Sequence, residues 1–368
     1  MNRMDIPSDV YESLIHKAVS GNGNSTRIRK AIDKGKSEPV TIAFLGGSVT
    51  VGYTPYGMID ENYATLFCNY FSDKYCSNGC TCINAGLPGP GSMMGLAFAE
   101  NRVRDKQPDI MFVEFAVNNS MEKIQIIAFE SLVDKLLEFP GEPAVIPIIV
   151  CSQDFYTCSS YMELVAQHYD LPVVNIYHLL KAGIEEGSFL WSDYSRDFGH
   201  PTLAGHRLIA DCILRLFENL ERKEDSGYSI PREACFSRTF SSFQLMDHHN
   251  LILEEGSPFE PSVTNPELPD GWRYTRNDKN QSLQVAFHCK SLFVLYEVGN
   301  SMDYGELEVS EDDTVIFRID SYNINGWNNP DIKLVLNEDE ARIHKLVIRI
   351  RRGDENKKFF ILGFGVVN

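Results

Sequence analysis

The pattern of apolar and polar residues divides the chain into two regions with different expected secondary structure. From about residue 39 to 220, short β-branched apolar runs alternate with segments that have helical periodicity. Such alternation is typical of a parallel sheet covered by helices on both faces. Strands are predicted at 39–47, 81–86, 108–119, 143–150 and 171–176, and helices at about 61–75, 92–106, 123–138, 159–169 and 202–220.

Beyond about residue 239 the helical periodicity disappears. Short apolar runs are separated there by clusters of Asn, Asp and Gly, a spacing that predicts a β-sandwich or jelly roll. The polar stretch before it contains Gly and Pro, as linkers often do. The expected parts are a helical extension that packs on the sheet (1–38), an α/β domain (39–220), a linker (221–238) and a β-sandwich (239–368).

Length and charge narrow the possible roles. The 368 residues exceed what a single core usually serves, which agrees with two domains. The chain has 34 basic and 51 acidic residues and a net charge of -17, which argues against nucleic acid or an anionic membrane as partner, since phosphate binding needs clustered Lys and Arg. No signal-peptide run or membrane-spanning stretch is recognisable, so a cytoplasmic location is expected.

The nine cysteines are scattered, but four of them, Cys68, Cys76, Cys80 and Cys82, lie close together. Zinc sites usually contain CxxC pairs or accompanying histidines. Here the last three form C-x3-C-x-C without a nearby histidine. We therefore expect reduced thiols and no metal site.

Four segments that can carry chemistry fall at the carboxyl ends of the predicted strands, where parallel α/β sheets bind their ligands. In the first, FLGGSVT (44–50), Ser48 follows a strand and two glycines. Glycines allow the chain to turn tightly there and expose the serine hydroxyl. The alternative is a serine that only caps the next helix.

The second and third segments offer hydrogen-bond donors. NAGLPGPGS (84–92) contains three glycines and two prolines, which predicts a fixed turn whose backbone N–H groups can approach a ligand. EFAVNN (114–119) ends in two asparagines, and a neutral amide can donate to an oxyanion without titrating. A simple tight turn and a helix cap are the respective alternatives.

The fourth segment, SDYSRDFGHPTLAGHRLIA (192–210), places Asp197 and His200 three residues apart, just before the last helix. A carboxylate in this position can hold one imidazole nitrogen while the other nitrogen faces the serine. The alternative is a solvated loop with Thr202 as a helix cap. Asp193 is a second candidate for the carboxylate, and His206 is expected to be structural.

In order and spacing, these four segments resemble the four sequence blocks of the SGNH (GDSL-like) hydrolases, over about residues 40 to 220. Ser48 matches the nucleophile, and Asp197 and His200 match the D-x-x-H pair. Gly89 and Asn118 match the oxyanion-hole residues of the second and third blocks. The resemblance implies a flavodoxin-like three-layer α/β/α fold and serine ester hydrolysis without a cofactor, in which the Ser48 N–H also serves the oxyanion hole.

The chain departs from the family pattern at two positions. Glycine precedes Ser48 where the family name has aspartate, and Asn119 stands where the third block usually ends in aspartate. Neither change removes a catalytic group of the family. The second change is expected to loosen the local loop.

An α/β domain with an appended β-sandwich resembles microbial carbohydrate esterases, so acetylated oligosaccharides, such as xylan or mannan fragments, are the expected substrates. Trp191, before the catalytic loop, and Trp327, in a turn-rich segment, are candidate substrate-binding residues. Most of the other aromatic candidates are expected to be core residues: Trp272, Tyr274, Tyr304 and Tyr322. The alternatives are a lipase or thioesterase, for which no long apolar insertion is evident, and a catalytically silent carbohydrate-binding protein.

Overall fold

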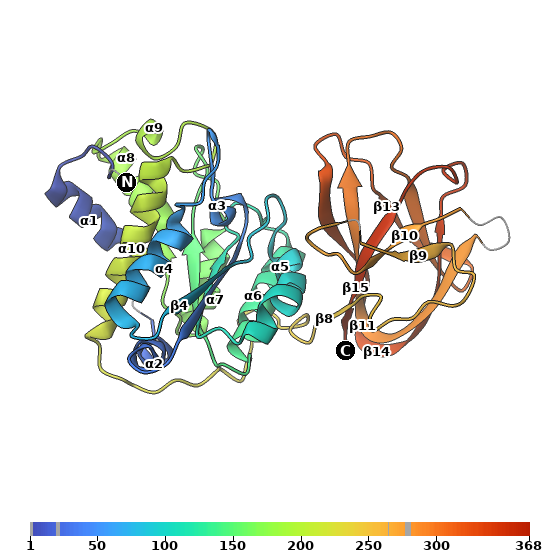
Figure 1. The fold of residues 1–368 in the computed structure, drawn as a ribbon, viewed down its shortest axis with the longest axis horizontal. Helices are drawn as coiled ribbons and strands as arrows, with labels where there is room; N and C mark the ends of the chain where they lie inside the picture. Colours follow the sequence, from blue (N-terminus) through green and yellow to red (C-terminus); the bar gives the residue numbers. More distant parts are fainter. Residues whose placement is uncertain (1–2, 20–22, 264, 277–280) are drawn as a thin grey trace. The chain divides into compact units, whose positions relative to one another are not determined.

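A computed structural model describes residues 3–19, 23–263, 265–276 and 281–368. The chain divides into two compact units, Met1–Thr239 and Phe240–Asn368 (Figure 1). The first unit is built on a parallel sheet and the second on an antiparallel sheet. This succession confirms the fold class predicted from the sequence.

The sheet of the first unit has five parallel strands in the order β4-β1-β5-β6-β7. Counted along the chain, this is the order 2-1-3-4-5 of flavodoxin-like folds. The three central strands are almost entirely buried, as their continuous apolar runs predict. The strands are β1 (Val40–Gly46), β4 (Cys80–Asn84), β5 (Ile110–Glu114), β6 (Ala144–Ile149) and β7 (Val174–Asn175).

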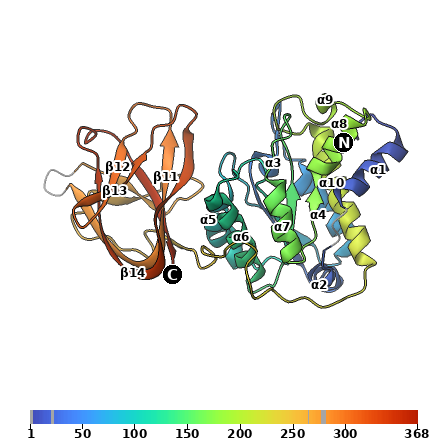
Figure 2. The same ribbon diagram turned by 180° about the vertical axis from the view of Figure 1, so that it is seen from behind.

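Helices form two layers around this sheet, shown from opposite sides in Figures 1 and 2. On one side α10 (Leu203–Glu221) contacts α4 (Tyr63–Tyr75) and α2 (Thr26–Gly35). On the other side α6 (Lys123–Leu137) contacts α5 (Ser92–Phe98) and α7 (Ser159–His168). The N-terminal α1 (Ser8–Ala18) packs against α10 and α8 (Ile176–Glu185). None of the described helices is both long and apolar enough to cross a membrane.

Several local features differ from the prediction. The helix expected at 92–106 is α-helical only to Phe98 and continues as a π-helical turn, Ala99–Val103, and a 3-10 turn, Arg104–Lys106. The helix α8 was not among the helices predicted above. Four short elements were not predicted either, because two to four residues give no periodic pattern. These four are α3 (Ser48–Val51), β2 (Tyr53–Thr54), β3 (Gly57–Met58) and α9 (Trp191–Tyr194).

The segment 221–238, expected to be a linker, belongs to the first unit and is held by a buried carboxylate. Glu130 of α6 accepts hydrogen bonds from the backbone N–H groups of Cys235, Phe236 and Ser237 at 2.5, 2.6 and 2.8 Å. These bonds satisfy backbone donors that no helix or strand pairs. The end of the segment is therefore anchored to the α/β unit.

The second unit contains one antiparallel sheet in the order β13-β12-β14-β11-β15-β10-β9, with β8 paired to β15. The sheet surrounds an apolar cluster that includes Trp272, Tyr274 and Phe364. Its strands are β8 (Gln244–Met246), β9 (Phe259–Ser262), β10 (Gly271–Tyr274), β11 (Ser282–Gly299), β12 (Glu306–Glu311), β13 (Thr314–Asp320), β14 (Trp327–Ile350) and β15 (Phe360–Val367).

Apolar runs that the sequence separates are joined in β11 and β14. The runs 282–288 and 292–298 are both part of β11, and 332–337 and 344–350 are both part of β14. The two strands pair with register shifts, one of them between Cys289 and Ser291. An irregularity of this kind bends and twists a strand without ending it. The single sheet can thus fold over on itself into the two layers of a sandwich, with each long strand running through both layers.

The cysteine cluster also differs from the expectation. Cys68 of α4 and Cys82 of β4 form a disulfide, so the expectation of reduced thiols is wrong for this pair. They are 14 residues apart in sequence, and the packing of α4 on β4 brings their Cα atoms to 6.2 Å. Cys76 and Cys80 remain free thiols.

Candidate active site

The turn that carries Ser48 connects β1 to α3 and requires its two glycines. A Cβ atom on Gly46 would lie 2.1 Å from the Thr50 hydroxyl oxygen. A Cβ atom on Gly47 would lie 2.2 Å from Oδ1 of Asn118. No side chain fits at either position, so the glycines allow this close approach. Ser48 then begins α3 with a partly exposed side chain.

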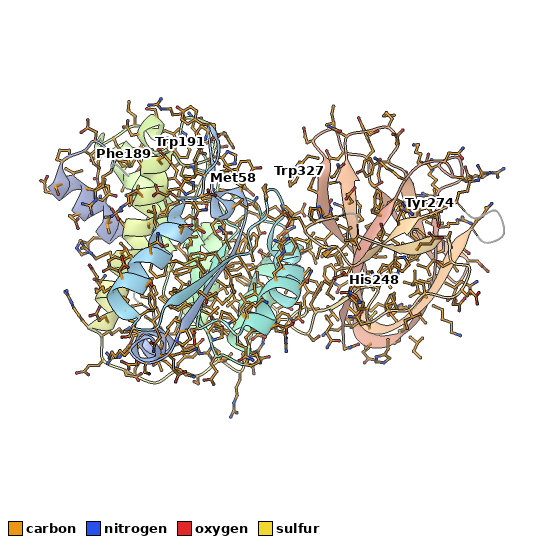
Figure 3. All side chains as sticks on the ribbon, in the orientation of Figure 1. Met58, Phe189, Trp191, His248, Tyr274 and Trp327 are labelled. Carbon is orange, nitrogen blue, oxygen red and sulfur yellow. A yellow bond between two sulfur atoms is a disulfide. The ribbon has the colours of Figure 1, made fainter. Side chains whose placement is uncertain are left out.

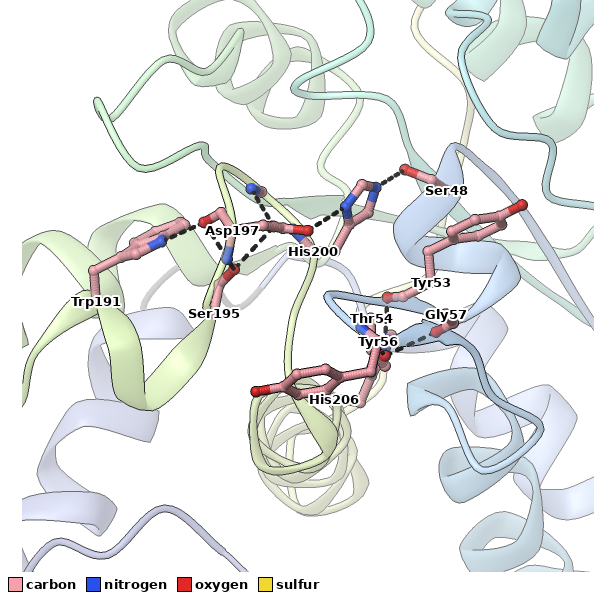
Figure 4. Close-up of polar contacts among 11 residues, drawn as sticks. Ser48, Tyr53, Thr54, Tyr56, Gly57, Trp191, Ser195, Asp197, His200 and His206 are labelled. Atoms are coloured by element: carbon pink, nitrogen blue, oxygen red, sulfur yellow. Dashed lines mark hydrogen bonds and ion pairs between the residues drawn. The ribbon is translucent and has the colours of Figure 1, made fainter. Parts of the chain in front are cut away.

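Two hydrogen bonds connect Ser48, His200 and Asp197 (Figure 4). Ser48 Oγ lies 3.0 Å from His200 Nε2, and His200 Nδ1 lies 2.9 Å from Asp197 Oδ2. An ionised carboxylate only accepts hydrogen bonds, so Nδ1 carries the proton and the lone pair of Nε2 faces the serine. This geometry can move the serine proton to the imidazole while the carboxylate stabilises the imidazolium.

The loop around Asp197 keeps its carboxylate ionised. Burial acts to raise the pKa of Asp197, but hydrogen bonds from His200 and Gly199 outweigh it, and the pKa lies below its ordinary value. The backbone N–H groups of these two residues donate to Oδ1 at 2.7 and 2.9 Å. Ser195 Oγ lies 3.2 Å from the same oxygen and is buried. Ser195 was not among the candidate residues predicted from the sequence.

Trp191 supports this loop. Its indole Nε1–H donates to the Asp197 carbonyl oxygen at 2.8 Å, as Figure 4 shows. Trp191 is not among the residues that line the pocket beside Ser48, and its predicted role in substrate binding stays a prediction. The alternative carboxylate, Asp193, accepts a hydrogen bond from the Leu190 N–H at the start of α9. That bond gives Asp193 a helix-capping role.

The two predicted oxyanion residues lie on separate loops that meet beside the Ser48 turn. The Asn118 amide donates to the carbonyl oxygen of Gly89 at 3.1 Å. Gly89 has a φ of +101°, in the left-handed region that favours glycine. The amide of Asn118 also lies against Gly47, as the close approach described above requires. The structure therefore brings Gly89 and Asn118 together next to the serine turn.

Asn119, which stands where the family's third block usually ends in aspartate, does not loosen its loop. The prediction of a looser loop is therefore wrong. It is buried, and its Oδ1 accepts a hydrogen bond from the Ser92 N–H at 2.8 Å. Its Nδ2 donates to Ser92 Oγ at 2.6 Å and to the Tyr161 hydroxyl at 2.9 Å. The amide thus supplies one acceptor and two donors to these three groups, which hold the loop in place.

A pocket of about 320 Å³ opens beside Ser48. Two aromatic side chains that the sequence analysis did not identify, Phe198 and Tyr156, are 61% and 40% exposed there. The backbone N–H of Gln153 donates to the Phe198 carbonyl oxygen at 2.8 Å, which ties the two pocket loops together. The lining residues are Ser48, Val49, Val117, Ser152, Tyr156, Asp197, Phe198, Gly199 and His200.

Glu114, at the carboxyl end of β5, is a fully buried carboxyl group beneath the serine turn. Its Oε2 lies 3.1 Å from Thr50 Oγ1 and 3.4 Å from the Gly47 nitrogen. Its Oε1 has no hydrogen-bond partner among the described residues. Burial raises the pKa of Glu114 to about 8, although these two hydrogen bonds act in the opposite direction. The group is therefore protonated at neutral pH.

His206 is structural, as predicted. Its Nε2 donates to the Tyr53 carbonyl oxygen at 3.1 Å (Figure 4), and its Nδ1 lies 3.4 Å from the Tyr63 nitrogen. Burial lowers the pKa of His206 to about 4. The ring is thus neutral and holds the chain beside the candidate site.

The remaining candidate, Trp327, belongs to the second unit, where it is 52% exposed (labelled in Figure 3). Trp272, Tyr274 and Tyr304 are buried in the same unit, as most of these aromatics were expected to be. Exposure leaves Trp327 available for a ligand.

Solved structures with the same two-domain architecture are known. A two-domain esterase (CEX) active on acetylated mannans matches 96% of this chain and 98% of its own, with a TM-score of 0.85 and 22% identity. A structure of such an esterase co-crystallised with mannopentaose matches the same shares, with a TM-score of 0.83 and 21% identity. No model of a known family matches the chain, and neither does any curated protein sequence. The chain thus has the fold of a two-domain esterase, which confirms the resemblance at the level of the fold.

Proposed function

We propose that this protein is a serine esterase that releases acetyl groups from acetylated oligosaccharides. The observation that carries the proposal is the pair of hydrogen bonds from Ser48 through His200 to Asp197. Nucleophile, base and carboxylate in this order are the parts that acyl transfer through an acyl-enzyme requires.

In the proposed reaction, His200 Nε2 takes the proton of Ser48 as Oγ attacks the ester carbonyl carbon. The carbonyl π electrons move to oxygen, and Asp197 stabilises the imidazolium. His200 then protonates the departing sugar oxygen as the C–O bond breaks, which leaves an acetyl group on Ser48. Water, deprotonated by His200, then attacks the acetyl carbon. The bond from this carbon to Ser48 Oγ breaks, His200 returns the proton to Oγ, and acetate is released.

The oxyanion would be stabilised by the N–H groups of Ser48 and Gly89 and by the Asn118 amide. An amide nitrogen carries two hydrogens. The bond from Asn118 to the Gly89 carbonyl therefore leaves a second N–H to donate. Its position against the serine turn supports this role.

The pocket supports a sugar ester as substrate. Phe198 and Tyr156 present exposed aromatic surface beside Ser48, and aromatic rings stack on the apolar faces of pyranose rings. The esterases of like fold are described as active on acetylated mannans, and one was crystallised with mannopentaose. We assign Trp327 a sugar-binding role in the second unit on the same chemical grounds.

A second candidate is an acylhydrolase that acts on lipid or coenzyme A esters. The apolar side chains of Val49 and Val117 in the pocket favour it, since a longer acyl chain would gain free energy from burial against them. The length of the preferred acyl group separates the two candidates.

The test compares the wild-type protein with Ser48→Ala and, as a matched control, Ser160→Ala, which changes an exposed serine of α7. Hydrolysis of 4-nitrophenyl acetate and longer esters is measured, together with acetate release from acetylated mannan and xylan oligosaccharides. We expect activity in the wild type and control and its loss in Ser48→Ala. Full activity in Ser48→Ala would exclude this serine as nucleophile, and a preference for long acyl chains would exclude the acetyl-sugar assignment.

A further inference from the structure

Two histidines and an aspartate gather on the second unit. His248 and His249 lie in the turn that follows β8, and Asp270 directly precedes β10. One ligand atom from each side chain lies within 4.8 Å of the other two. His248 is labelled in Figure 3.

The spacing of one pair already matches metal coordination. His249 Nε2 lies 3.3 Å from Asp270 Oδ1. A tetrahedral zinc ion with bonds of about 2.0–2.1 Å places neighbouring ligand atoms about 3.3 Å apart. The pair therefore has the separation of two adjacent corners of such a site.

The third side chain is held by a hydrogen bond to the backbone. His248 Nδ1 lies 3.2 Å from the carbonyl oxygen of Gly271. A carbonyl oxygen only accepts, so Nδ1 carries the proton and Nε2 of the neutral ring has the free lone pair. Histidine ligands usually donate their other ring N–H to a carbonyl or carboxylate in this way, which fixes the tautomer and the ring orientation.

The backbone that carries the three side chains is fixed as well. The His248 N–H donates to the Asp270 carbonyl oxygen at 2.9 Å, which joins the two segments. The turn is closed by Asp247, which accepts from the His249 N–H at 2.9 Å and whose own N–H donates to Asn250 at 2.8 Å. Little ordering is then required when an ion binds.

We propose that His248, His249 and Asp270 form a binding site for a borderline divalent cation, with zinc as the best fit. Imidazole and carboxylate ligands suit zinc, nickel and copper, whereas calcium and magnesium prefer oxygen ligands. The net charge of -17 attracts cations in general. The site lies outside the proposed esterase chemistry, which uses residues of the first unit alone.

A bound ion would join the turn after β8 to the start of β10. β8 is a three-residue strand that pairs only with β15 among the described strands. An ion that binds the folded unit and not the unfolded chain raises the apparent stability. The ion would thus act as a structural clamp on the first strand of the second unit.

The test uses the full chain after removal of metals with a chelator. Zinc chloride is titrated into the wild type, His249→Ala and Asp270→Asn, and binding is followed by calorimetry. His288→Ala is the matched control, because it removes an exposed histidine of β11 in the same unit. Asp270→Asn keeps the size of the side chain and the backbone contact, so it tests the ligand role without a change of fold.

We expect the wild type and His288→Ala to bind one more equivalent of zinc than the other two variants, or to bind it at least tenfold more tightly. Zinc should also raise the unfolding midpoint of the wild type and not that of His249→Ala. If zinc were bound only by the free thiols, all four proteins would bind it with equal stoichiometry and affinity. That result would overturn the proposal. So would an absence of saturable binding to the wild type.

Discussion

Replacing Glu114 with glutamine should reduce the dependence of folding stability on pH. In the unfolded chain this carboxyl ionises near 4.5, whereas burial raises the pKa of Glu114 to about 8 in the folded protein. Between these values the folded state binds more protons than the unfolded state. The free energy of unfolding therefore falls as pH rises through this interval and levels off above about pH 8.

The size of the effect follows from the same two values. The interval from 4.5 to about 8 spans about 3.5 pH units. At 1.36 kcal/mol per unit, the free energy of unfolding is lower by about 5 kcal/mol once the pH is above about 8. Glutamine keeps the shape of the side chain and an oxygen that can accept from Gly47 and Thr50. It does not titrate, so the variant should lack this loss.

Urea unfolding of the wild type and Glu114→Gln, at half-unit steps from pH 5 to 9, measures the difference in their free energies of unfolding. The transition of the first unit is followed by a probe within that unit. Contributions from all other titrating groups cancel in the difference. The stability of the variant relative to wild type should rise by about 1.4 kcal/mol per pH unit and reach a plateau near pH 8. A difference that does not change with pH would refute the assigned buried, protonated state.

Three further substitutions test the site and its support. Asn118→Ala should lower kcat on 4-nitrophenyl acetate by about 10²–10³ with little change in KM, because it removes an oxyanion donor; an unchanged kcat would exclude that role. Gly47→Ala should displace the Asn118 amide, because the alanine Cβ would lie 2.2 Å from Asn118 Oδ1, and so lower kcat in the same assay. Unchanged kinetics would contradict this close approach. Glu130→Ala should destabilise the first unit by about 1–3 kcal/mol, since the backbone N–H groups of residues 235–237 lose their acceptor. Urea unfolding that shows no loss would mean that this anchor contributes nothing.

Local patterns in the sequence identified the parts of this protein. The alternation of apolar runs with helical periodicity predicted the five parallel strands, and the loss of that periodicity after residue 239 predicted the β unit. Two glycines before Ser48 and the D-x-x-H spacing of Asp197 and His200 marked the candidate site. These features are readable because each depends on neighbours within a few residues along the chain.

Protonation states and hydrogen-bond partners depend on residues that are distant in sequence, so only the tertiary structure determined them. Burial beneath the serine turn sets the protonation state of Glu114, and nothing in its sequence neighbourhood indicates this. Asn119 is satisfied by Ser92 and Tyr161, and Trp191 supports the Asp197 loop from a position that its own segment does not specify. Hydrogen bonds and desolvation act through space, so their effects on individual side chains were fixed only when the chain had packed.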